Sequence, residues 1–252
     1  MKIETYIFRR IIKKVNNKMW KYVCKMIYLI CFLGIIGSIS SASVLVSSIN
    51  DVNVETKDEE KAQEEIVERK RVALTFDDGP SPGVTSKLLD ALKERGVKAT
   101  FFVIGENAAA YPELIKREIE EGHTVGNHTY THVNIKQISL AEALEELEKT
   151  NKVIEEISGV PVEYMRPPFG EWDKEVEKET NMIPVLWSVD TLDWTTENVD
   201  EIVNRVVTDI SENDIILLHD CYESSVNAVI RIIDILQAEG YEFVTVEELI
   251  LN

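Results

Sequence analysis

Two histidines and a pair of aspartates are the first residues of this sequence whose types and spacing could support chemistry. His128 and His132 are separated by three residues in GNHTYTH, and Asp77 and Asp78 are adjacent in TFDDGP. Taken alone, each stretch could be a polar surface loop or turn. Taken together, two imidazoles and one carboxylate suit Zn²⁺ or another first-row divalent cation, with open positions for water and substrate. The second carboxylate would then be free to move protons.

Three further motifs contain residues that could act beside such a metal. Arg166 in MRPPFG is either a surface arginine or a guanidinium that keeps a neighbouring carboxylate ionised and oriented. SVDTLDW supplies Asp190 and Asp193, either of which could pair with a histidine. His219 in ILLHD is either a buried structural histidine or, paired with Asp193, a general acid. His123 fits no ligand spacing, and we expect a structural role for it.

The elements that must position these residues alternate between short apolar runs and helical patterns. We expect strands at 72–76, 99–105, 123–128, 162–167, 183–190, 214–220 and 242–246, and helices at 83–95, 111–121, 139–157, 172–180, 198–211 and 224–239. This alternation predicts a parallel sheet. We therefore expect an α/β fold, and because about 180 residues are fewer than the ~250 of a complete barrel, a (β/α) barrel would be incomplete or distorted. The reactive residues all follow strands, which predicts that they meet at one face of the barrel.

The N-terminal part of the chain differs from the rest in charge and hydropathy. Residues 1–25 carry eight basic side chains against one acidic side chain, a charge of +7. The whole chain has a net charge of −18, so the remaining residues carry −25. That acidic remainder argues against nucleic acid as a partner. Residues 26–46 are uncharged, and their number matches the ~20 that span a bilayer as a helix. By the positive-inside rule, residues 1–25 are expected in the cytoplasm.

These features predict four segments. They are a basic cytoplasmic segment (1–25), one transmembrane helix (26–46), a charged linker (47–70) and a catalytic domain (71–252). We expect a single-pass protein of the cell membrane with its catalytic domain outside the cytoplasm. The alternative is a cleaved signal peptide and a secreted domain.

Five motifs in this order resemble those of a known family. TFDDGP, HTYTH, RPPFG, DTLDW and LLH look like the motifs of the polysaccharide deacetylases, which are carbohydrate esterases of family 4 with a NodB homology domain. The resemblance covers about residues 71–251. It implies a distorted (β/α) barrel and the hydrolysis of N-acetyl groups on amino-sugar polymers. It also implies a divalent metal, with Zn²⁺ expected first and Co²⁺ or another first-row metal as alternatives.

The resemblance also implies roles for the reactive residues. Asp77 corresponds to the general base and His219 to the general acid, while Arg166 tunes Asp77 and Asp193 orients His219. The implied metal ligands are Asp78, His128 and His132.

Four residues are implied to contact the substrate. Pro168 and Phe169 would shape the groove wall, with the Phe169 backbone N–H as a donor to the oxyanion, and Trp194 and Leu217 would line the pocket for the acetyl methyl group. Trp187 lies in an apolar run and is expected in the core. The expected substrate is N-acetylglucosamine in a cell-envelope polymer, with peptidoglycan first. Chitooligosaccharides, poly-N-acetylglucosamine and an inactive sugar-binding module on the same fold are the alternatives.

Overall fold

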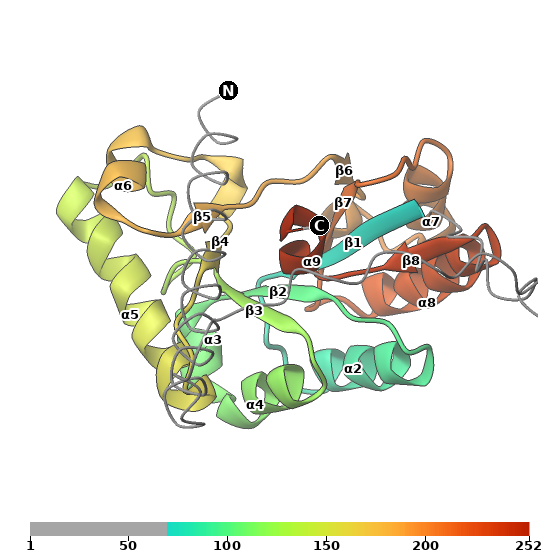
Figure 1. Cartoon of the computed structure of the whole chain (residues 1–252), viewed down its shortest axis with the longest axis horizontal. Helices are drawn as coiled ribbons and strands as arrows, with labels where there is room; N and C mark the ends of the chain where they lie inside the picture. The colour runs from blue at the N-terminus through green and yellow to red at the C-terminus, as the bar shows by residue number, and fades with distance from the viewer. Residues whose placement is uncertain (1–69, 252) are drawn as a thin grey trace, which may run out of the picture. The chain divides into compact units, whose positions relative to one another are not determined.

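The computed structural model describes residues 70–251, which form an α/β domain (Figure 1). Eight strands in these residues form one sheet. They are β1 (Lys70–Asp77), β2 (Thr100–Val103), β3 (Thr124–Asn127), β4 (Tyr164–Met165), β5 (Ile183–Pro184), β6 (Val189–Asp190), β7 (Ile215–His219) and β8 (Tyr241–Phe243). The helices are α2 (Val84–Glu94), α3 (Gly105–Ala110), α4 (Pro112–Glu120), α5 (Leu140–Ser158), α6 (Lys174–Glu179), α7 (Val199–Val207), α8 (Glu223–Ala238) and α9 (Val246–Leu251). Two short 3₁₀ helices, η1 (Pro168–Gly170) and η2 (Asp193–Thr195), complete the elements.

The strand order and the parallel pairing place the carboxyl ends of the strands, which carry the reactive residues, on one side of the sheet. The sheet runs β5-β4-β3-β2-β1-β7-β6, with β8 also paired to β1, and every strand pair is parallel. Asp77 at the end of β1 is in register with Phe102 of β2 and with His219 of β7. In a parallel sheet the carboxyl ends of all strands lie on one side, so the prediction that the reactive residues converge is confirmed.

The expected strand at 183–190 is wrong as a single element, and its division explains the shape of the sheet. Its first part, β5, lies at one edge of the sheet, and its last part, β6, lies at the other. Between them, Val185 N–H donates to Met165 O at 2.8 Å, and Ser188 N–H donates to Ile215 O at 3.0 Å. The four residues 185–188 thus connect the two edges. The sheet is a curled parallel half-barrel, in agreement with the incomplete barrel that the sequence predicts.

Helices cover the outside of this sheet. Neighbouring helices follow the order α5, α4, α2, α8 and α7 (Figure 1). The large apolar cluster lies between them and the sheet and includes the fully buried Leu74, Leu88, Ile216 and Ile232. The hydrophobic effect of burying these side chains is the main force that holds the helices on the sheet.

Helix α5 shows how local sequence sets an element's limits. The Ser139 side chain accepts from Glu142 N–H and the Glu142 carboxylate accepts from Ser139 N–H, so a capping box begins the helix. Gly159 ends the helix at φ 72°, in the left-handed region that glycine adopts without strain. The observed helix, Leu140–Ser158, therefore lies within one residue of the expected range.

The expected N-terminal segments 1–25 and 26–46 lie outside the described residues, as does nearly all of the linker 47–70. Within residues 70–251, no helix combines the length and the apolar character that crossing a membrane requires.

Candidate functional site

A cavity of about 490 Å³ opens at the carboxyl ends of the strands. Segments as far apart in the sequence as Asp77 and His219 contribute to its wall. Its lining residues are Asp77, Asp78, His128, His132, Phe169, Trp187, Asp190, Trp194, Leu217, His219 and Tyr222. The structure thus brings together nine residues that the sequence singled out, and adds Trp187 and Tyr222.

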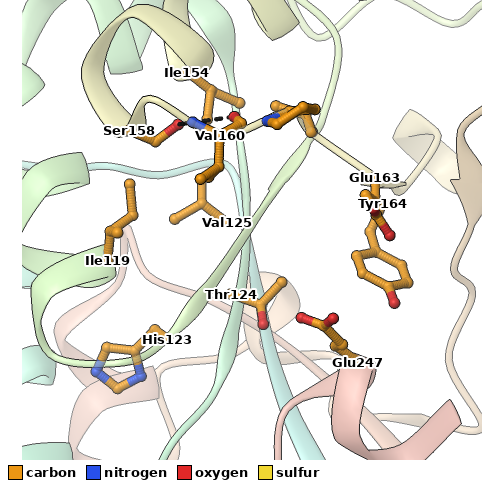
Figure 2. Close-up of a pocket in the computed structure, with 12 residues that line it drawn as sticks. Ile119, His123, Thr124, Val125, Ile154, Ser158, Val160, Glu163, Tyr164 and Glu247 are labelled. Atoms are coloured by element: carbon orange, nitrogen blue, oxygen red, sulfur yellow. Dashed lines mark hydrogen bonds between the residues drawn. The ribbon is translucent and has the colours of Figure 1, made fainter. Parts of the chain in front are cut away.

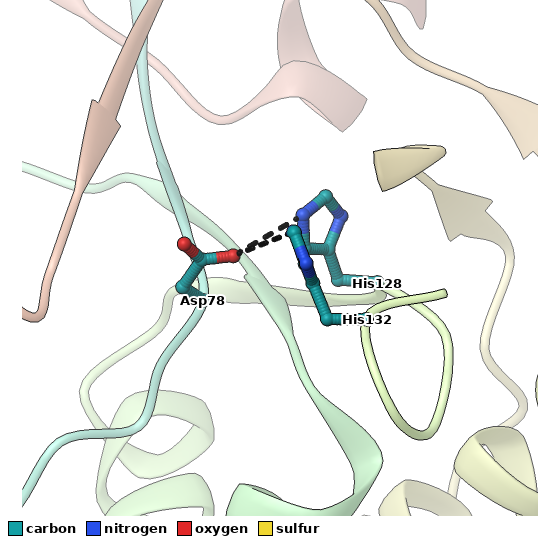
Figure 3. Close-up of side chains that lie close together, drawn as sticks. All are labelled: Asp78, His128 and His132. Carbon is teal, nitrogen blue, oxygen red and sulfur yellow. Dashed lines mark ion pairs between the residues drawn. The ribbon is translucent and has the colours of Figure 1, made fainter. Parts of the chain in front are cut away.

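Three of these residues point their ligand atoms toward one another (Figure 3). Asp78 Oδ1 lies 3.4 Å from His128 Nε2 and 3.2 Å from His132 Nε2. The ligand atoms of the three residues all lie within 4.8 Å of one another. Asp78, His128 and His132 therefore form a group that could hold a metal ion. They are the three residues that the family resemblance implies as metal ligands.

The hydrogen bonds around this group fit a cation. His128 Nδ1 lies 2.7 Å from the Arg166 carbonyl oxygen, which can only accept, so this nitrogen carries a proton and, in the neutral imidazole, Nε2 presents a lone pair. Asp78 Oδ1 is buried and accepts no hydrogen bond within the described part of the chain. A lone pair and a buried carboxylate oxygen that face each other repel unless a positive charge lies between them. A backbone carbonyl on the outer nitrogen is also the usual way of orienting a metal-bound imidazole.

The pKa values of Asp78 and His132 favour the forms of these side chains that bind a metal. Burial opposes ionisation of Asp78, but the neighbouring histidines in their protonated forms, His128 foremost, outweigh it and hold the pKa of Asp78 below its ordinary value. Burial lowers the pKa of His132, and the opposing attraction of Asp78 does not cancel this effect. An ionised carboxylate beside a neutral imidazole is the state that a divalent cation requires.

The backbone at these ligands is held in an uncommon conformation. Asp78 has φ 73° and His132 has φ 58°, values that few residues other than glycine adopt. The loop with the two histidines is fixed from α5, because the Glu146 carboxylate accepts the N–H groups of Tyr130 and Thr131 at 2.9 and 2.8 Å. Strained residues persist only where surrounding contacts hold them, so we infer that this loop is built to place the ligands.

Arg166 joins the candidate base to the rest of the barrel. Its side chain is fully buried, and Nη1 donates to Asp77 Oδ1 at 2.8 Å and to Thr75 Oγ1 at 2.7 Å. Nε donates to Val185 O at 3.1 Å. The other Asp77 oxygen, Oδ2, lies 3.7 Å from His128 Nε2. Asp77 is thus paired on one side and faces the metal group on the other.

Asp193 and His219 form the second acid and base pair of the cavity. Asp193 Oδ1 lies 2.7 Å from His219 Nδ1, and Oδ2 accepts from His219 N–H at 2.8 Å. Burial alone would lower the pKa of His219. The hydrogen bond and charge of Asp193, with contributions from Asp77 and Asp78, outweigh burial and raise it to about 9. His219 is therefore protonated at neutral pH, as a general acid must be.

Asp220 is a buried carboxyl that the sequence did not single out. Its Oδ2 accepts from the Thr85 hydroxyl at 2.6 Å, and Thr85 Oγ1 in turn accepts Ser81 N–H at 2.7 Å. A Cβ at Gly79 would overlap the Asp220 carboxyl, so only glycine fits at that position. This packing ties the TFDDGP turn to the strand end that carries His219. Burial raises the pKa of Asp220 to about 7.

The residues expected to contact substrate divide into two groups. Phe169 and Trp194 are 65% and 57% exposed at the cavity, where Phe169 also packs edge-on against His132, and Leu217 is buried in its wall. Pro168, by contrast, is buried and is not among the residues that line the cavity.

Trp187 and Tyr222 were not expected at the cavity. Trp187 is only partly buried, so its expected core position is wrong, because residues 185–188 cross between the edges of the sheet and do not continue a strand. Tyr222 contacts His219 edge-on, with ring centroids 6.1 Å apart. The position of Tyr222, three residues after the candidate acid His219, indicates only weakly that it lies at the cavity.

His123 lies in a different place. It lines a separate cavity of about 340 Å³ with Ile119, Val125, Thr124 and Tyr164 (Figure 2). Its Nδ1 accepts Ala99 N–H at 3.1 Å, and burial lowers its pKa to about 4. A neutral imidazole that bonds a backbone amide is what the structural interpretation predicts.

Comparison with known proteins points to one family. The polysaccharide deacetylase family model matches residues 64–185. The peptidoglycan-N-acetylglucosamine deacetylase PgdA of Listeria monocytogenes is 41% identical over 180 residues, which are 71% of this chain and 39% of that protein. The chitooligosaccharide deacetylase of a Bradyrhizobium species is 38% identical over 190 residues, which are 68% of this chain and 86% of that protein. The chain thus spans about two fifths of the length of PgdA.

Comparison of structures gives the same result. The structure of PdaC from Bacillus subtilis, a peptidoglycan-N-acetylmuramic acid deacetylase, matches with a TM-score of 0.71 and 41% identity. The match covers 72% of this chain and 90% of that structure. With the five ordered motifs, the curled half-barrel and these matches in agreement, the chain belongs to the polysaccharide deacetylase family, carbohydrate esterase family 4.

Proposed function

We propose that this chain is a metal-dependent hydrolase that removes N-acetyl groups from N-acetylglucosamine residues of a cell-envelope polysaccharide, with peptidoglycan as the first candidate. One observation carries this proposal. A single cavity contains the metal-binding group together with Asp77, which Arg166 holds, and His219, which Asp193 holds. Membership of the family and the names of the relatives PgdA and PdaC support the choice of peptidoglycan.

The proposed metal is Zn²⁺, because two imidazoles and a carboxylate are ligands that zinc favours. The chemistry that a divalent cation supplies at such a site is Lewis acidity toward an amide carbonyl and a water molecule. Asp78, His128 and His132 would hold it.

The residues around the metal group are placed for amide hydrolysis. Asp77, held by Arg166, is the carboxylate placed to take a proton from the attacking water. Water adds to the acetamide carbon, the carbon–nitrogen bond breaks, and the products are acetate and the free amine of the sugar. His219 is the group placed to give the departing nitrogen its proton. Phe169 and Trp194 offer apolar faces on which a sugar ring can pack.

Acetate release by the full chain purified in detergent tests this proposal. The chain is loaded with Zn²⁺ or Co²⁺ and incubated with peptidoglycan fragments, chitooligosaccharides and acetylated xylan, and mass spectrometry identifies the deacetylated sugar. We expect release from the N-acetylglucosamine of peptidoglycan fragments, and none from the Asp77→Asn variant. Deacetylation of N-acetylmuramic acid alone, or no release from any substrate, would contradict the proposal.

A chitooligosaccharide or poly-N-acetylglucosamine substrate is the second candidate. The observation in its favour is the 38% identity to the Bradyrhizobium chitooligosaccharide deacetylase, of which this chain covers 86%. Acetate release from chitooligosaccharides in the absence of release from peptidoglycan fragments would decide for it.

We also propose that residues 26–46 anchor the chain in the cell membrane with the catalytic domain outside the cytoplasm. The uncharged segment and the basic residues before it support this arrangement. Carbonate extraction of membranes tests the anchor, and N-terminal sequencing of the mature protein tests the alternative of a cleaved signal peptide. Release of the chain into the soluble fraction with an N-terminus after residue 40 would replace the anchor by a secreted form.

A further inference from the structure

Asp193 accepts hydrogen bonds at both of its carboxylate oxygens, and one donor comes from a helix that the reaction does not otherwise use. His219 donates from Nδ1 to Oδ1 at 2.7 Å and from its backbone N–H to Oδ2 at 2.8 Å. The third donor is the hydroxyl group of Ser225, which also bonds Oδ2. Asp193 and Ser225 are 2% and 1% exposed, so solvent does not compete for this contact.

Ser225 is well placed to hold a carboxylate still. It is the third residue of α8, a helix of 16 residues that packs in the main core through Val229, Ile232 and Ile233. Asp193, by contrast, begins the three-residue η2 directly after Leu192, which has φ 51°. A carboxylate rotates readily about its last torsion, because the preferences of that torsion are broad. A donor from a long, packed helix therefore restricts a group that its own short element would leave free to turn.

A helix-capping role does not account for this hydroxyl group. In the described residues, no side chain caps the start of α8, and Ser225 directs its hydroxyl proton away from the helix, onto Asp193. The neighbouring Ser224 is half-buried. Ser225 alone of the two thus reaches the acid pair.

We propose that Ser225 is a positioning residue for the acid pair: its hydroxyl group fixes the plane of the Asp193 carboxylate and so aims the imidazole of His219 into the cavity. The reasoning is geometric. With Nδ1 bonded to a fixed Oδ1, the ring has one orientation, and its Nε2 faces the cavity that His219 lines. This inference rests on the proposed function, in which His219 delivers a proton from Nε2.

The test uses three single variants of the full chain. Ser225→Ala removes the donor, Ser225→Thr keeps it, and Ser224→Ala is the matched control on the half-buried neighbour. The pH titration of the His219 ring is followed by NMR in metal-free protein without substrate. The charged groups Asp77 and Asp78 and the ring of Tyr222 near His219 are the same in all variants. Acetate release then gives kcat and KM for each metal-loaded variant.

We expect Ser225→Ala to lower the midpoint of the His219 titration by about 0.5 pH unit or more, because a carboxylate that has turned away from Nδ1 favours the imidazolium form less. A fall would show that the carboxylate has turned away from Nδ1, as the positioning role predicts, whereas a rise would show that Ser225 only shares the charge of Asp193 and would overturn that role. We expect kcat to fall about tenfold with KM within about twofold, and Ser225→Thr to restore both.

An unchanged His219 titration in Ser225→Ala would overturn the proposal, even if the variant were less stable. An equal displacement in Ser224→Ala would also overturn it, because the effect would then belong to the start of α8 in general. The titration needs neither metal nor substrate. A wild-type chain that released no acetate would therefore refute the proposed function and leave the positioning role to be decided by the titration.

Discussion

The pair formed by Asp193 and His219 makes a quantitative prediction about protonation. The substitution Asp193→Asn removes the charge but keeps a side chain of the same shape. In the wild type, the hydrogen bond and charge of Asp193 are the main contributions that overcome burial and raise the pKa of His219 from 6.5 to about 9. Without them, burial dominates, and we expect the pKa of His219 in the variant to fall below 6.5.

The size of the effect follows from the same pKa. A rise from 6.5 to about 9 corresponds to roughly 3 kcal/mol in favour of the imidazolium form, and the His219 side chain is only 13% exposed, so solvent screens little of it. Because the pKa is raised on folding, the pair stabilises the fold fully below pH 6.5, and this stabilisation is lost as the pH rises through 9. The asparagine variant should lack this decline in the free energy of unfolding.

The assay is the NMR titration of His219 in metal-free chains, because a bound cation would itself lower the pKa. Asp190→Asn is the matched control, since it removes a charge from the same cavity wall while its carboxylate bonds Leu192 N–H and not His219. We expect the control to titrate close to the wild type. At neutral pH the Asp193→Asn variant should release acetate about 10² to 10⁴ times more slowly. A His219 that still titrated near 9 in this variant would refute the assignment of its raised pKa to Asp193.

Four more predictions concern the metal group, the base, the barrel and the cavity rim. His132→Ala should weaken Zn²⁺ binding by at least about 100-fold in isothermal titration calorimetry, and wild-type affinity would exclude His132 as a ligand. Asp77→Asn should keep stoichiometric Zn²⁺ yet lose at least about 100-fold in kcat, and full activity would remove Asp77 as the base. Arg166→Met should lower the free energy of unfolding by about 3 to 5 kcal/mol in urea titrations, since it leaves the Asp77 charge buried and unpaired; a loss below about 1 kcal/mol would contradict this. Trp194→Ala should raise KM for oligosaccharides more than it lowers kcat, and the reverse pattern would place Trp194 at the reacting atoms.

Elements with strong local signals were predictable from the sequence. Helix α5 has a capping box at its start and a glycine after its end, and its limits were predicted to within one residue. Helix α3 had no such signal. Its first residue, Gly105, was expected in a strand, and the first N–H groups of the helix donate to Thr129 O and Tyr130 O of the histidine loop. A helix that starts on tertiary contacts cannot be recognised from local sequence alone.

The candidate site was predictable where motifs carry the chemistry and unpredictable where long-range packing does. Asp78, His128 and His132 could be grouped because strand ends meet at one edge of a parallel sheet. Ser225 and Thr85 could not be grouped with the site, because a serine or threonine near the start of a helix is an ordinary residue there. Only the fold shows that their hydroxyl groups reach the Asp193 and Asp220 carboxylates.

The buried guanidinium of Arg166 has a consequence for how proteins of this architecture can change. It contacts β1 through Thr75 and Asp77, and it contacts the segment that joins the two edges of the half-barrel through Val185 and Leu186. The guanidinium that holds the candidate base thus also links β1 to the segment that connects the two edges of the half-barrel. A descendant could abandon catalysis by replacing a metal ligand and still fold, whereas replacing this arginine would endanger the fold itself. Retention of the arginine in a diverged sequence is therefore evidence of an intact barrel, and not of a working enzyme.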